Sequence, residues 1–137
     1  MIGLKKLLRS CVIKLKTLLN ERVDYQQIAS QLVKSYKLKS KVKITGGSNK
    51  ADYNWMTDTI NLRRSYPNVK EFIITVLHEI KHALDAKKMG KKRYEKAYQK
   101  AGDIAVNKGR DFHDDNEFEE KAENWGKKEY LKWKNKI

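Results

Sequence analysis

The spacing of apolar residues changes along the chain, and each change predicts a different kind of element. In the first twenty residues, apolar side chains recur three and four positions apart between basic residues, the pattern of an amphipathic helix. Its apolar stripe consists of Leu4, Leu8, Cys11, Leu15 and Leu18. We expect this stripe to pack on the domain or on a partner helix, and binding to a membrane surface is the alternative. A second helix is predicted from Asp24, which forms a capping box with Gln27.

The middle of the chain alternates with a period of two, which is typical of β-strands. KVKIT (41–45) and DTINLRRS (58–65) alternate clearly, and ADYNW (51–55) could be a returning strand after the turn residues GGSNK (46–50). The pattern predicts a small antiparallel sheet of about three strands. TINLR (59–63) could be an edge strand that pairs with an extended substrate, or an ordinary sheet strand.

The second half of the chain returns to helical spacing. Asn68 and Glu71 form a capping box, which predicts the start of a long helix that ends near Gly90. The remaining segments are predicted to be a helix over 94–106, a loop over 107–115 and a final helix over 116–133.

The polar side of the long helix carries the candidate chemistry, in the stretch LHEIKHALDA (77–86). His78 and His82 are one turn apart on the same face, so both imidazoles can reach a single ion. Glu79 points about 100° away around the helix axis. From there a carboxylate can act as a general base on a metal-bound water without being a ligand. An HExxH match arises by chance in about 1 in 200 such chains, and two solvated surface histidines are the alternative.

A catalytic zinc ion needs a third protein ligand and an open position for water. The short-spacing class of zinc site is excluded, because the sixth residue after His82 is Lys88 and is not a metal ligand. The remaining candidates are His113 in the predicted loop and, on the final helix, Glu119, Glu120 and Glu123.

HEIKHALD followed by a helix of the form E-x-x-A-E resembles the gluzincin metallopeptidases. The likeness covers roughly residues 41–130, and the motif is similar to those of small phage and bacterial gluzincins and of the catalytic domain of anthrax lethal factor. It implies that Glu119 is the third zinc ligand and that Glu123 supports a ligand histidine. The alternative is that Asn116 and Glu119 only form a capping box at the start of a solvated acidic helix.

Two positions depart from the family pattern. Lys81 lies inside the HExxH core, where many relatives have a small residue, and we expect it to point outward. Phe112 stands where the lethal-factor type carries a tyrosine that supports the reaction. The adjacent His113 could donate a hydrogen bond to the developing oxyanion, and a solvated loop histidine is the alternative.

Composition narrows the choice of compartment and partners. The chain of 137 residues has 31 Lys and Arg against 17 Asp and Glu, a net charge of +14, which favours contact with polyanions such as nucleic acid. Its single cysteine, Cys11, excludes an intrachain disulfide and a Cys-rich zinc module. No apolar run reaches the roughly 20 residues of a transmembrane helix. Because Lys14 and Lys16 interrupt the apolar part of a signal peptide, we expect a cytoplasmic protein, or a virion-associated one if a phage encodes it.

Together these observations predict one α+β domain with a minimal zincin-like fold. A basic helical segment (1–40) packs on a metallopeptidase core (41–137). Zinc is held by His78, His82 and Glu119, and Glu79 activates water to hydrolyse a protein or peptide substrate. The alternative is a non-catalytic, zinc-stabilised basic protein that binds nucleic acid or forms part of a phage particle. A protein anchored to a membrane surface by its first helix is a third reading.

Overall fold

The computed structural model describes residues 24–45 and 50–136. The predicted amphipathic helix in the first twenty residues and most of the predicted turn at 46–50 lie outside the described residues. The elements follow the chain in the order α2 (Tyr25–Ser35), β1 (Lys41–Ile44), β2 (Asp52–Asn54), β3 (Thr59–Leu62), α3 (Val69–Met89), α4 (Lys91–Asn107) and α5 (Glu117–Lys136). Within the described part of the chain, no helix is long and apolar enough to span a membrane.

The sheet confirms the predicted α+β class but not the predicted pairing. Its strand order is β1-β3-β2. β1 runs parallel to β3, with Val42 opposite Ile60, and β2 runs antiparallel to β3, with Tyr53 opposite Ile60. The sheet is therefore mixed, and the prediction that all its strands are antiparallel was wrong.

Of the two alternatives for TINLR, the structure shows the ordinary sheet strand and not the edge strand, because β3 is the central strand. Thr59, Ile60 and Leu62 are buried, so this strand gains most from having neighbours on both sides. Strands adjacent in sequence often pair with each other, but β1 and β2 do not. Here β3 inserts between β1 and β2, and β2 becomes an edge of the sheet.

α2 and α3 begin directly after the predicted capping residues. Asp24 accepts a hydrogen bond from the Gln27 backbone N–H (3.1 Å), and Asn68 accepts one from the Glu71 backbone N–H (2.9 Å). α3 ends at Gly90, whose φ of +88° suits a residue without a Cβ.

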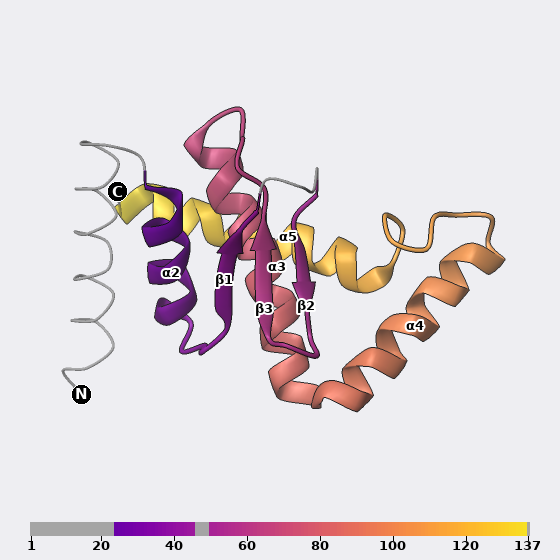
Figure 1. Cartoon of the computed structure of the whole chain (residues 1–137). Coiled ribbons are helices and arrows are strands. Elements are labelled where there is room, and N and C mark those ends of the chain that lie inside the picture. Colours follow the sequence, from indigo (N-terminus) through magenta and orange to yellow (C-terminus); the bar gives the residue numbers. More distant parts are fainter. Residues whose placement is uncertain (1–23, 46–49, 137) are drawn as a thin grey trace.

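The apolar side of α3 forms the centre of the core. Phe72, Leu77 and Ile80 are fully buried there and pack with Ile28 of α2 and Ile60 of β3. Figure 1 shows α3 behind the sheet, with α5 crossing it and α4 extending away before the chain returns. The opposite side of α3 therefore faces α4, α5 and the edge strand β2.

Candidate metal centre

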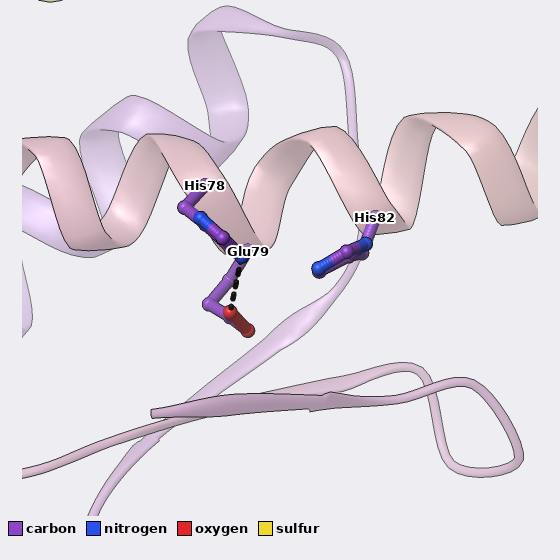
Figure 2. Close-up of side chains that lie close together, drawn as sticks. All are labelled: His78, Glu79 and His82. Carbon is purple, nitrogen blue, oxygen red and sulfur yellow. Dashed lines mark ion pairs between the residues drawn. The ribbon is translucent and has the colours of Figure 1, made fainter. Parts of the chain in front are cut away.

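α3 positions the two histidines and the glutamate of the motif beside one another. Ligand-capable atoms of His78, Glu79 and His82 all lie within 4.8 Å of one another, so this group could hold a metal ion. Figure 2 shows the three side chains on the same part of α3, with His78 and Glu79 close enough for an ion pair. His82 and Glu79 are only 3 % and 4 % exposed. The reading of two solvated surface histidines does not fit such burial.

α5 contributes a carboxylate that lies closer to both imidazoles than Glu79 does. Glu119 Oε1 is 2.7 Å from His78 Nε2 and 2.9 Å from His82 Nε2, whereas Glu79 Oε1 is 3.8 Å from His78 Nε2. Glu119 is buried, and its neighbour Glu120 is exposed. Two imidazole nitrogens and one carboxylate oxygen form a donor set typical of catalytic zinc. Glu119 Oε1 therefore lies nearer to the two histidine nitrogens than Glu79 Oε1 lies to His78.

Each of the three candidate ligands has a second hydrogen-bond partner on its outer side. His78 Nδ1 lies 2.9 Å from Glu123 Oε2, the contact that the family resemblance implies. His82 Nδ1 lies 3.0 Å from the Tyr94 hydroxyl, and the Tyr98 hydroxyl donates to Glu119 Oε2 over 2.7 Å. Outer partners of this kind fix the orientation and tautomer of metal ligands.

Sequence analysis did not identify either tyrosine. Tyr94 and Tyr98 are one turn apart on α4, and Tyr94 is almost completely buried. A buried tyrosine hydroxyl usually finds a hydrogen-bond partner, and the four-residue spacing matches that of the histidine pair. This spacing was the available signal, but the sequence does not show which way α4 turns from Gly90.

His113 reaches the site from the loop between α4 and α5. Its Nε2 is 3.3 Å from Glu119 Oε2, and its side chain is about half exposed, at 53 %. The loop is attached to α4 through Phe112, whose ring covers Gly102 so closely that a Cβ there would lie 2.3 Å from it. Phe112 thus contacts α4. Because it has no hydroxyl, it cannot replace the tyrosine that the lethal-factor type carries at this position.

Two hollows meet at the candidate centre. The first, of about 310 Å³, lies between residues 52–56 and the side chains of Glu79, His82, Tyr98 and Glu119. The second, of about 460 Å³, lies beside His78 and the acidic face of α5. Both are lined by His113 and Glu119, and among the described residues none of those lining either hollow is a Lys or Arg. A ligand could therefore approach the histidines from both sides.

Burial and the crowding of charges shift the protonation of the site. Burial raises the pKa of Glu79 to about 8, although nearby His78 opposes the shift. Burial alone would lower the pKa of His78, but the hydrogen bond to Glu119 and the charges of Glu79 and Glu119 raise it to about 9. The pKa of Glu119 stays well below its usual range, because hydrogen bonds from His78 and His82 outweigh its burial. At neutral pH these pKa shifts favour a protonated His78 beside a charged Glu119.

Glu79 also has an orphaned oxygen. Its Oε2 is buried and has no hydrogen-bond partner among the described residues. A buried carboxylate oxygen without a partner is costly, and native proteins rarely keep one without a functional reason. Glu79 is one of the residues that line the first hollow.

No family model matches the sequence, and the comparisons with curated proteins and with solved structures found no match. The fold and site by themselves define an α+β protein with a His-Glu-His group that could hold a metal ion.

A glycine sets the distance between the two ligand helices. A Cβ on Gly126 of α5 would lie 3.2 Å from Ile74 O and 3.3 Å from His78 N. We expect Gly126→Ala to push α5 outward by a few tenths of an ångström and to weaken zinc binding about tenfold, by moving Glu119 and Glu123 from His78. Stability should change little, because alanine favours the helix by up to about 1 kcal/mol. Zinc competition and thermal melts of the chelated protein measure both effects, and unchanged zinc affinity would contradict this role of Gly126.

Proposed function

We propose that the chain is a zinc-dependent metallopeptidase of the gluzincin type. The observation that carries the proposal is the position of Glu119 Oε1, within hydrogen-bond distance of both histidine Nε2 atoms, beside a buried Glu79 with an unpaired oxygen. His78, His82 and Glu119 would hold the zinc ion. When bound, zinc supplies a Lewis acid that polarises a carbonyl and lowers the pKa of water.

The residues around the centre suit peptide hydrolysis. Glu79 has the general-base role: its carboxylate accepts the proton of the attacking water and returns it to the leaving amine. His113 lines both hollows and is exposed enough to move, so it is the candidate donor to the developing oxyanion. β2 is the edge strand beside the first hollow, so an extended peptide could pair with its free side.

Cleavage of a denatured protein or a mixed peptide library tests this function directly. The full chain should cleave the library, lose activity with a chelator and regain it when zinc is added back. If the chain carries one zinc ion yet cleaves nothing, the metal centre is not that of a peptidase acting on such substrates.

The net charge of +14 favours a second function, in which zinc only stabilises a basic protein that binds a polyanion. A polyanion would bind away from the two hollows, since no Lys or Arg among the described residues lines them and several carboxylates do. In that case nucleic-acid binding should weaken steeply with salt and should be unaffected by Glu79→Gln. Library cleavage that depends on Glu79 would favour the peptidase instead.

The raised pKa values of His78 and Glu79 predict an effect of pH on the stability of the metal-free chain. The pKa of His78 rises from 6.5 to about 9 on folding and that of Glu79 from 4.5 to about 8, so the folded chain binds more protons than the unfolded one. Stability from these two groups is present at low pH and is lost as the pH rises toward 8 and 9. His78 would have to lose its proton to bind a metal ion, so metal binding should strengthen over the same range.

Melting temperatures of the chelated and the zinc-loaded chain should therefore diverge between pH 6.5 and 8.5. We expect the chelated protein to melt lower at pH 8.5 and the increase caused by zinc to be larger there. A chelated protein that becomes more stable over this range would contradict the raised pKa values of His78 and Glu79.

A further inference from the structure

α4 presents two tyrosine hydroxyls to the candidate centre, and each contacts a different ligand residue. Tyr94 reaches His82 Nδ1 over 3.0 Å, and Tyr98 reaches Glu119 Oε2 over 2.7 Å. Because the tyrosines are one turn apart on α4, a single helix position sets both contacts. The two contacts differ chemically, since one joins an imidazole nitrogen and the other a carboxylate oxygen.

Tyr94 is placed to act on the tautomer of His82. The side chain of His82 is hydrogen-bonded at both ring nitrogens, with Nε2 facing Glu119 and Nδ1 facing Tyr94. A metal ion on Nε2 requires the proton to be on Nδ1, and this proton then needs an acceptor. The Tyr94 oxygen is the group in position. Its ring is held by the rings of Trp55 and Phe118, at centroid distances of 6.2 and 5.5 Å, so the hydroxyl cannot easily move away.

Tyr98 acts on the other oxygen of Glu119. Oε1 faces the two imidazoles, while Oε2 receives the Tyr98 hydroxyl and lies 3.3 Å from His113. A carboxylate with one oxygen committed to a hydrogen bond has one oxygen left for a metal ion. Zinc sites are usually satisfied by four ligands, whereas manganese favours a larger number of oxygen ligands.

We propose that Tyr94 and Tyr98 are positioning residues for the metal, with separate effects. Tyr94 accepts the His82 Nδ1 proton and so holds the imidazole in the metal-binding tautomer. Tyr98 restricts Glu119 to coordination through one oxygen and so biases the centre toward zinc. This inference rests on the metal site of the proposed function but not on peptide hydrolysis.

The test compares Tyr94→Phe and Tyr98→Phe in the full chain. Each variant keeps the aromatic ring and removes only the hydroxyl. Tyr36→Phe is the matched control, because Tyr36 hydrogen-bonds Glu129 and Trp133 away from both hollows. Zinc and manganese affinities are measured by competition with a chelating dye, and the visible absorption of the cobalt(II) form reports the coordination number. Thermal melts of the metal-free variants show whether each one folds.

Tyr94→Phe should weaken zinc and manganese by a similar factor of about 10 to 100, with little change in the cobalt spectrum. Tyr98→Phe should change the ratio of zinc to manganese affinity by about tenfold in favour of manganese, and should weaken the cobalt absorption as the coordination number rises. Tyr36→Phe should leave the affinities and the spectrum unchanged.

Other outcomes overturn the inference. If Tyr98→Phe leaves both the affinity ratio and the cobalt spectrum as they were, Tyr98 does not control Glu119. If Tyr36→Phe weakens zinc as much as Tyr94→Phe does, the effect is a general loss of stability and Tyr94 has no positioning role. A wild-type chain that binds no metal contradicts both this inference and the proposed function, whereas zinc binding without hydrolysis contradicts the peptidase alone.

Discussion

The chain purified with alanine in place of His82 should contain almost no zinc, whereas the wild-type chain should contain about one zinc ion. His82 Nε2 lies 2.9 Å from Glu119 Oε1, and its side chain is almost completely buried. Alanine removes one of the three proposed protein ligands and leaves a space that water alone would fill. Elemental analysis of the purified protein gives the stoichiometry directly.

Loss of the ion should also change stability. A ligand that binds only the folded chain stabilises it by about 2.7 kcal/mol when its concentration is 100 times its dissociation constant. The melting temperature of the wild-type chain should therefore rise with added zinc. That of His82→Ala should not, which separates a loss of binding from a loss of folding.

Two adjacent glutamates on α5 provide the matched control. Glu119 is buried with Oε1 between the imidazoles, and Glu120 is exposed on the next position of the helix. Glu119→Ala should remove the zinc, and Glu120→Ala should keep it. His113→Ala should also keep it, because His113 is half exposed and lies on the far oxygen of Glu119. The opposite result for Glu119 and Glu120, or zinc loss in His113→Ala, would show that the third ligand is misassigned.

The helices could be predicted from the sequence because their signals are local. Asp24 and Asn68 cap α2 and α3 as predicted, and Gly90 ends α3. The helix predicted over 94–106 begins earlier, at Lys91, directly after Gly90, where no cap side chain marks the start. A helix boundary without a capping side chain has no local signal to read.

The sheet could be predicted only as a set of strands. The alternation in 41–45 and 58–65 identifies strands but not their neighbours, since strand order depends on contacts distant in sequence. Ile60 and Leu62 are buried because β3 lies in the centre of the sheet. This burial depends on the folded core and cannot be read from the strand alone. For this reason β3 is the central strand and β2 is an edge of the sheet.

The candidate centre also has one part that local spacing predicts and another part that depends on the fold. The i,i+4 spacing of His78 and His82 placed both imidazoles together from local geometry alone. The choice of Glu119 over Glu120 came from the family resemblance, because two adjacent acids on a helix cannot be ranked without knowing which face is buried. Tyr94 and Tyr98 were missed because their direction depends on how α4 leaves Gly90.

The general base can be tested without disturbing the metal ligands. Glu79→Gln keeps nearly the same shape, and the side chain lies 3.8 Å from His78, farther than Glu119 does. We expect the variant to retain its zinc. An amide cannot accept the proton of the attacking water, so hydrolysis should fall by about a hundredfold or more. Cleavage of the peptide library by wild type and variant at equal zinc content measures this effect.

Glu71→Gln is the matched control, since Glu71 is an exposed glutamate on the same helix and lies two turns before the motif. It should cleave the library as the wild type does.

Glu123→Ala should be intermediate between the wild type and Glu79→Gln. The loss of the acceptor 2.9 Å from His78 Nδ1 should cost about 10- to 100-fold in metal affinity or activity, while every proposed ligand stays in place. A Glu79→Gln chain that still cleaves the library at the wild-type rate would move the base to another residue. If wild type and variant both carry zinc and neither cleaves, the centre is a structural one, and the charge of +14 becomes the better guide to function.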